Sequence, residues 1–248
     1  MSGHNKWASI KHKKAAADSK RGKIFTKIIR ELTVAAKSGG GDPNTNPRLR
    51  TIIDSAKGAN MPAENIDRAI KKGTGELEGV TYEETLYEGY GPSGVAMLVR
   101  CLTDNKNRTA AEVRNIFNKY NGAMAGAGSV AWIFEKKGLL VVEQNAASED
   151  QLMEIALSAG ADDMTLSGEQ YEITVNAHGF EAVKEALAQA KIPTVSAEIT
   201  MIPKNQVPIT PEGARSVLNL IDALEEQDDV QNVYANCEIP DELIKELG

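Results

Sequence analysis

The sequence predicts a multidomain α+β protein in which a basic three-helix domain precedes two α/β sandwich domains, the second inserted in the first. Three observations predict this. Apolar residues recur at helical spacing through residues 20–75, and from residue 85 apolar strands alternate with short amphipathic helices. The charge also divides sharply: residues 1–75 carry 16 Lys or Arg against 6 Asp or Glu, whereas residues 76–248 carry 12 against 29. The net charges of +10 and −17 sum to the −7 of the whole chain.

The first helix is expected over residues 20–37. Its apolar face is formed by residues three and four apart, namely Ile24, Phe25, Ile28, Ile29 and Leu32. Lys20, Lys23, Lys27 and Arg30 follow the same spacing about half a turn away. One side of this helix therefore packs and the other presents a line of cations.

The segment before this helix continues the positive charge, since residues 1–30 hold nine Lys or Arg and one acid, Asp18. A polyanion is the natural partner of such a line, because phosphate contacts release condensed counterions. The alternative is a solvated helix face. Trp7 lies among the cations, where it either stacks on a base or anchors the arm to the domain. The nine cations are Lys6, Lys11, Lys13, Lys14, Lys20, Arg21, Lys23, Lys27 and Arg30.

Two further helices complete the N-terminal domain. One is expected to begin at Pro47 behind the N-cap Asn46 and to end at Gly58. The next opens after Pro62 and ends at Gly73 and Gly75. The glycine run 39–41 is not a phosphate loop, because no Gly-Lys-Ser/Thr follows it. Three amphipathic helices can cover one another's apolar faces, so a small bundle with a basic arm is predicted.

Residues 76–83 form a composition break, after which strands are expected. The predicted order is a strand at 85–90, a turn at 91–94, a central strand at 95–102 and a helix at 108–120. A loop of Gly and Ala residues at 122–128 then leads to a strand at 129–134.

Residues 138–202 contain a ferredoxin-like βαββαβ order. The expected elements are strands at 139–143, 164–166, 171–175 and 195–201, and helices at 149–159 and 180–190. The helix at 211–226 and the strand at 230–237 have no partners of their own, so they are expected to return to the sheet begun at 85–103. The predicted domains are 1–78, 79–136 plus 204–240, and 137–203.

An enzymatic site finds little support in the sequence. His4, His12 and His178 lack metal-ligand spacing, and Cys101 and Cys237 form no CxxC pair. We therefore expect no enzyme activity, cofactor, metal or small-molecule substrate, and two buried reduced thiols. No apolar run is long enough to span a membrane and no secretory signal is present, so a cytoplasmic protein is expected.

Two polar groups leave alternatives open. The first is the densest acidic cluster, which comprises Asp222, Glu225, Glu226, Asp228 and Asp229. We expect it to be either a docking surface for a basic protein or a metal, or a solvated helix end. Asn105, Asn107 and Arg108 lie where a strand meets a helix. They contact a phosphate or a partner, or they cap the helix.

Several long motifs resemble the YebC-type family of transcriptional regulators, whose mitochondrial relatives are translational activators of cytochrome oxidase. They are Gly3 to Trp7, Lys20 to Lys27, Gly39 to Pro43, Asn46 to Arg50, Tyr87 to Pro92, Thr103 to Thr109, Gly128 to Trp132 and Asp228 to Tyr234. The loop before Ser129 departs from relatives, which often carry Gly-Asn-Leu-Gly there, and this puts a polar role of the loop in doubt. The motifs begin at Gly3, without room for a transit peptide, so the resemblance is to the bacterial branch.

The resemblance implies a three-domain α/β architecture with the helical domain first, and no enzymatic activity. It also implies two roles, DNA-binding regulation of transcription and action on translating ribosomes. It adds two cations, so the expected nucleic-acid-binding set is Lys6, Trp7, Lys11, Lys13, Lys14, Lys20, Arg21, Lys23, Lys27, Arg30, Arg48 and Arg50.

The function expected from the sequence is non-enzymatic nucleic-acid binding, with DNA as the partner of a transcriptional regulator. The alternative is a ribosome-associated translation factor that binds ribosomal RNA through the same basic domain. In either case the phosphate backbone is the main contact. Charge reversal at Lys23, Lys27 and Arg30 is then expected to weaken binding and to flatten its salt dependence.

Overall fold

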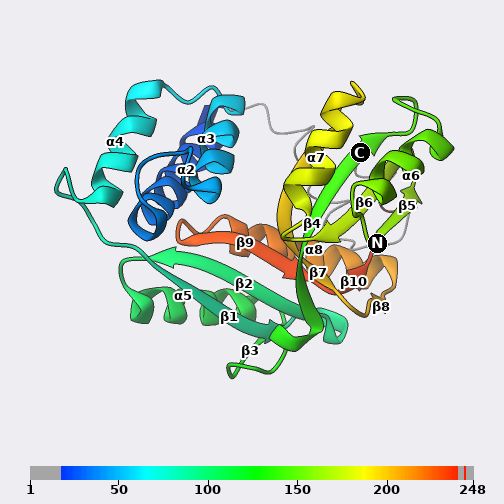
Figure 1. Ribbon diagram of the computed structural model, residues 1–248. Helices are drawn as coiled ribbons and strands as arrows, with labels where there is room; N and C mark the ends of the chain where they lie inside the picture. The colour runs from blue at the N-terminus through cyan, green and yellow to red at the C-terminus, as the bar shows by residue number, and fades with distance from the viewer. Residues whose placement is uncertain (1–17, 240–242, 244–248) are drawn as a thin grey trace.

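The computed structural model describes residues 18–239 and residue 243 (Figure 1). Its N-terminal part is a bundle of three helices, α2 (Asp18–Gly39), α3 (Pro47–Gly58) and α4 (Ala63–Thr74). The Asn46 side chain accepts a hydrogen bond from the Leu49 amide at 3.1 Å, which confirms it as the N-cap of α3. Gly75 ends α4 with a φ of 83°, in the left-handed region that glycine tolerates. The bundle core includes Leu32, Leu49 and Ile66.

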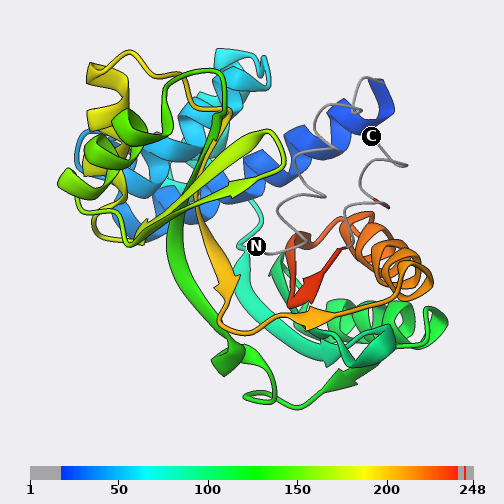
Figure 2. The same cartoon turned by 90° about the vertical axis from the view of Figure 1, so that its right-hand side faces the viewer.

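The first sheet has the strand order β3-β1-β2-β9 and is antiparallel throughout. Its strands are β1 (Glu83–Tyr90), β2 (Ala96–Thr103), β3 (Ala123–Ala125) and β9 (Val230–Ala235). Helices α5 (Lys106–Lys119) and α8 (Pro211–Glu225) lie side by side on one face (Figure 2). Because β9 pairs with β2, the chain returns to this sheet near its C-terminus.

The central strand β2 is buried on both faces, which explains its unbroken apolar run. Met97 and Val99 belong to the core formed with α5 and α8. Ala96 and Leu98 point to the opposite face, where they pack in a smaller cluster with Ile133 and Tyr234. Figure 1 shows the helical bundle and the second sheet on this opposite side.

The second sheet has the order β5-β6-β4-β7, again antiparallel. Its elements follow one another as β4 (Phe134–Glu143), α6 (Glu149–Ser158), β5 (Asp163–Ser167), β6 (Gln170–Asn176), α7 (Phe180–Gln189) and β7 (Ser196–Pro203). This is the expected βαββαβ order. The remaining pieces are short: η1 (Pro92–Gly94), η2 (Ala131–Ile133), and the paired strands β8 (Val207–Pro208) and β10 (Cys237–Glu238). The domain limits at residues 78, 136 and 203 stay predictions.

The strand expected at 129–134 is wrong. Residues 131–133 form the 3-10 turn η2, and β4 begins only at Phe134. The buried carboxylate of Glu88 accepts hydrogen bonds from the amides of Gly128, Val130 and Ala131, so these amides are unavailable to a neighbouring strand. Part of the loop expected at 122–128 is instead β3, which pairs with β1. No helix in the described part of the chain is long and apolar enough to cross a membrane.

Candidate nucleic-acid interface

Three members of the predicted cation line of α2, Lys23, Lys27 and Arg30, face the acidic α/β body. Lys23 forms an ion pair with the Glu226 carboxylate, and the Lys27 ammonium donates to the Glu225 carbonyl at 3.0 Å. These two acceptors lie at the C-terminal end of α8, where the last carbonyls lack partners within the helix and carry the negative end of its dipole. The two lysines therefore cap α8.

Arg30 makes the most buried of these contacts. One of its terminal nitrogens lies 2.5 Å from an oxygen of Asp229 and 3.0 Å from the Leu102 carbonyl. The guanidinium carbon also lies 5.2 Å from the ring centroid of Tyr82, within cation–π range. Only 13% of the Arg30 side chain is exposed. We call the contacts of Lys23, Lys27 and Arg30 with residues 225–229 the first seam.

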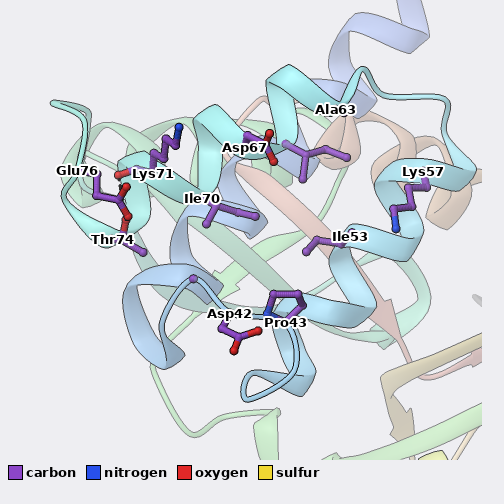
Figure 3. A pocket seen from close by; sticks show the side chains of 12 residues that line it. Asp42, Pro43, Ile53, Lys57, Ala63, Asp67, Ile70, Lys71, Thr74 and Glu76 are labelled. Atoms are coloured by element: carbon purple, nitrogen blue, oxygen red, sulfur yellow. Dashed lines mark hydrogen bonds between the residues drawn. The ribbon is translucent and has the colours of Figure 1, made fainter.

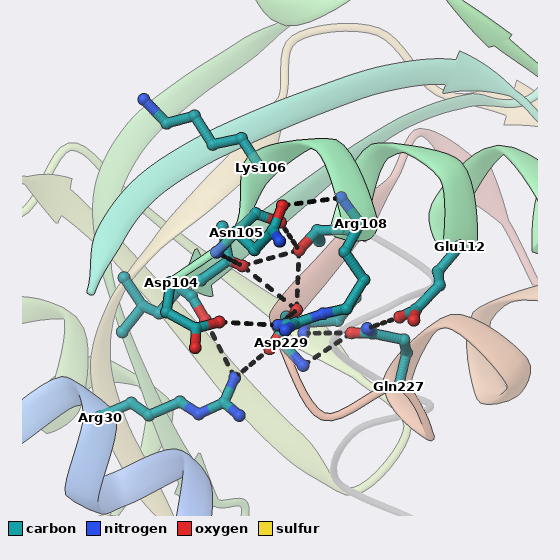
Figure 4. Close-up of polar contacts among 12 residues, drawn as sticks. Arg30, Asp104, Asn105, Lys106, Arg108, Glu112, Gln227 and Asp229 are labelled. Atoms are coloured by element: carbon teal, nitrogen blue, oxygen red, sulfur yellow. Dashed lines mark hydrogen bonds and ion pairs between the residues drawn. The ribbon is translucent and has the colours of Figure 1, made fainter. Parts of the chain in front are cut away.

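Asp229 is the centre of the first seam (Figure 4). Its other carboxylate oxygen accepts from Arg108 at 2.8 Å, from Thr109 at 2.7 Å and from Thr103 at 3.2 Å. Burial by itself raises the pKa of Asp229, but the donors Arg108, Thr109 and Arg30 outweigh it and lower the pKa to about 2. A carboxylate with 2% of its surface exposed thus stays ionised between two arginines.

The structure shows what several of the residues with open alternatives contact. Asn105 accepts from the Arg108 amide at 3.1 Å and is the N-cap of α5, while Arg108 itself binds Asp104 and Asp229. In the acidic cluster, Glu226 and Asp229 form ion pairs with α2 of the same chain, so this part of the cluster is neither a solvated helix end nor a surface open to a separate basic protein.

A second seam lies between α2 and the strands β1 and β2. Arg100 of β2 forms ion pairs with Glu31 of α2 and with Glu84 of β1, the latter at 2.8 Å. Arg48 of α3 reaches the same two carboxylates at 3.3 and 3.1 Å. Burial raises the pKa of Glu84, but Arg100 and Arg48 lower it to about 2. Two arginines and two carboxylates therefore tie the bundle to the first sheet.

The first seam opens into a cavity of about 650 Å³ that carries five carboxylates and three cations. Its lining residues are Lys23, Arg30, Tyr82, Asp104, Arg108, Glu112, Glu226, Gln227, Asp228 and Asp229. The excess of carboxylates makes this cavity a poor site for phosphate. The described residues contain no group of three or more His, Cys, Asp or Glu side chains able to hold a metal ion.

A second cavity, of about 570 Å³, lies within the bundle between α3, α4 and the loop after α2 (Figure 3). Ile53, Ile66 and Ile70 form its apolar part. Lys57 and Lys71 line it together with acids, namely Asp42, Asp67 and Glu76, so its charge is mixed. Neither cavity concentrates positive charge.

The structure divides the predicted site into separate groups. Lys6, Trp7, Lys11, Lys13 and Lys14 lie outside the described residues, and Lys20 and Arg21 lie in the first turn of α2. Lys23, Lys27 and Arg30 belong to the first seam, and Arg48 belongs to the second. Arg50 donates to the carbonyls of Pro43 at 3.1 Å and Asn44 at 3.4 Å, so it braces the loop before α3.

Sequence reasoning missed the acceptors that hold these cations. Glu31 and Glu84 were not singled out, and Asp229 was only one member of a cluster. No local pattern marks them, because Arg100 lies 69 residues from Glu31 and Arg30 lies 199 residues from Asp229. The one available signal was the opposite net charge of residues 1–75 and residues 76–248.

The fold and the seams define a class of α/β protein in which a basic helical bundle is held by ion pairs against an acidic two-sheet body. The chain belongs to the TACO1/YebC family. Residues 5–76 match the family's N-terminal domain, and residues 82–237 match its second and third domains.

Relatives cover the whole chain. A probable transcriptional regulatory protein of Geobacter sulfurreducens is 60% identical over 247 residues, which are 100% of both chains. One of Desulfatibacillum aliphaticivorans is 57% identical over 246 residues, 99% of this chain and 100% of that protein. The crystal structure of a conserved hypothetical protein from Aquifex aeolicus superposes with a TM-score of 0.81 at 49% identity, covering 90% of this chain and 92% of the other. The family membership and the relatives' names support a regulatory role.

Proposed function

We propose that this protein is a non-enzymatic transcriptional regulator that binds DNA through the cations of its N-terminal arm. The relatives' names support regulation of transcription. The observation that carries the DNA contact is the charge division, +10 over residues 1–75 against −17 over the remainder. A polyanion is attracted to one end of such a molecule and repelled by the rest.

Within that end, the seams argue for the arm over the helix. Lys23, Lys27 and Arg30 already bind Glu226, Glu225 and Asp229, so a phosphate would have to displace these acceptors. Breaking the Arg30 pair would leave a buried carboxylate without a main partner, which costs several kcal/mol. The arm cations Lys6, Lys11, Lys13 and Lys14 precede these contacts, and we assign them the main phosphate contacts.

The test compares two sets of substitutions by fluorescence anisotropy of a labelled duplex DNA at several salt concentrations. Replacing Lys6, Lys11, Lys13 and Lys14 by Ala removes four arm cations. If all four contact phosphates, the slope of log K against log salt falls by about 3 to 4, because each contact contributes about 0.9.

The control variant replaces Lys23 and Lys27 of the first seam by Ala. We expect the salt slope of this variant to stay near that of the parent protein, in contrast to the expectation drawn from sequence alone. An unchanged slope in the arm variant would overturn the proposal. The same titration with an RNA hairpin of equal charge tests the alternative that ribosomal RNA is the partner, since that alternative requires a clear preference for RNA.

A further inference from the structure

Trp132 is the most exposed of the large hydrophobic side chains in the described part of the chain, with 64% of its surface open to solvent. Tyr90, at the end of β1, is 42% exposed. The two side chains converge on one acceptor: the Trp132 indole nitrogen donates to the Ser129 carbonyl at 3.1 Å, and the Tyr90 hydroxyl lies 3.4 Å from the same oxygen. The aromatic rings of residues 90 and 132, which are far apart in the sequence, are thereby held near one point of the surface.

The loop that carries Trp132 is held from beneath. Glu88 accepts from the amides of Gly128 and Val130, both at 2.6 Å, and of Ala131 at 2.8 Å. Burial alone raises the pKa of Glu88, but these amides lower it below its ordinary value. On either side of Trp132 in the chain, Val130 and Ile133 are buried in the cluster above β2. The exposed indole is thus held by a loop whose backbone is already fixed. Contact with a ligand therefore costs little additional loop ordering.

The segment that carries Trp132 is itself uncharged in a body that is otherwise acidic. Residues 120–134 contain no Asp, Glu, Lys or Arg, and Glu88, which binds this loop from beneath, is only 6% exposed. Charged side chains begin at its border, with the exposed Glu135 and with Lys204, whose amide donates to the Ile133 carbonyl. The phosphate backbone of a nucleic acid is repelled by the acidic body, so a contact through phosphates is disfavoured here. A base presents a neutral π-face, which stacks on aromatic side chains whatever its identity.

We propose that Tyr90 and Trp132 form a stacking platform for an unpaired base of single-stranded nucleic acid. This inference rests on the proposed nucleic-acid binding and adds to it a contact on the body, on a different part of the chain from the arm. A duplex has no unpaired base to offer, so the platform distinguishes single-stranded from double-stranded nucleic acid.

The chain has two tryptophans, Trp7 and Trp132, so Trp7→Phe leaves Trp132 as the only indole reporter. The fluorescence comparison is made in this background and the affinities are measured with Trp7 in place, in both cases with the full-length protein. The probes are a single-stranded twelve-nucleotide RNA, its DNA counterpart, and the duplex formed by that DNA. We expect the single strands to quench Trp132 fluorescence and the duplex to leave it unchanged.

The affinity of each labelled probe is then measured by anisotropy in three further variants. Trp132→Ala is expected to weaken single-strand binding by about 5- to 150-fold, the range for loss of one stacked base, and to leave duplex binding unchanged. Trp132→Phe keeps a ring and restores most of that affinity. Leu157→Ala removes another exposed apolar side chain, 49% exposed on α6, and is expected to change neither affinity. Circular dichroism confirms that each variant is folded.

Two outcomes overturn the platform and leave the proposed function intact. The first is that the single strands bind without quenching Trp132 fluorescence, and the second is that they bind the parent and Trp132→Ala with equal affinity. A chain that binds neither single strand nor duplex overturns both. Concentration-dependent dimerisation that Trp132→Ala abolishes, seen by sedimentation velocity, also overturns the platform, because a second copy of the chain would then cover these rings.

Discussion

Arg30 in the middle of α2 and Asp229 in the loop between α8 and β9 form a buried ion pair, with 13% and 3% of their side chains exposed. Arg108 approaches the same carboxylate from α5, so one acid joins three segments of the chain. This relationship turns a helix face that looks like a ligand-binding surface into an internal contact.

Replacing Asp229 by Asn tests the importance of this contact for stability. The substitution leaves Arg30 and Arg108 without their shared anion, and breaking a buried pair on one side costs about 3 to 5 kcal/mol. Because Arg108 is 43% exposed, we expect the lower end, about 3 kcal/mol in the free energy of unfolding measured in urea. Asp228→Asn, at the exposed neighbouring position, is the control and is expected to change stability by less than about 0.5 kcal/mol. Equal effects at 228 and 229 would contradict the prediction.

The pKa of Asp229 predicts a stability that depends on acid pH. The ordinary pKa of 3.8 falls to about 2 in the folded protein, so the unfolded chain binds more protons between these values. Stability contributed by this carboxylate is therefore present above about pH 4 and is lost as the pH falls toward 2. Glu84, whose pKa is lowered from 4.5 to about 2, acts in the same direction. We expect Asp229 alone to account for about 2 kcal/mol of the decline, at 1.36 kcal/mol per pKa unit.

Urea unfolding at pH values from 2 to 6 measures this decline. In Asp229→Asn the curve should be flatter over the same range, because one of the titrating groups is gone. A variant whose stability falls as steeply as that of the parent would assign the acid sensitivity to other carboxylates.

Gly73 allows α4 to approach α2 closely. A Cβ at this position would lie 2.7 Å from the Ala36 side chain and nearer still to the Thr33 carbonyl. Gly73→Ala is therefore expected to cost about 1 to 3 kcal/mol in thermal or urea unfolding, as overpacking does. The matched control is Gly22→Ala on the same bundle, where, apart from the neighbouring backbone of α2 itself, no atom of the described residues lies within 4 Å of the added carbon. There the better helix former should raise stability by up to about 1 kcal/mol, and a loss at both positions would refute the packing argument.

Cys101 and Cys237 are expected to resist thiol reagents in the folded protein. Both are fully buried, and burial raises the pKa of Cys101 to about 12 and that of Cys237 to about 11, so little thiolate forms near neutral pH. Titration with a chromogenic disulfide should detect almost no thiol in buffer and two thiols per chain in urea. Rapid reaction in buffer would show that the core around β2 opens readily.

Much of the fold was predictable because its signals are local. The N-cap Asn46, the helix-ending Gly75 and the apolar run of β2 each act through neighbours in the chain, and each prediction was confirmed. The segment 129–134 was predicted wrongly because its amides bind Glu88, about 40 residues earlier, instead of a strand. A distant carboxylate overrode the apolar pattern.

The sequence by itself determined the helical and strand segments, the βαββαβ order and the separation of a basic end from an acidic body, since these depend on spacing, caps and composition. Only the tertiary structure decided which cations face outward. Lys23 and Arg30 are spaced as a solvent-facing row, yet their acceptors lie 203 and 199 residues away. Helical spacing specifies the face on which a side chain lies, but only the packing of distant segments determines what that face meets.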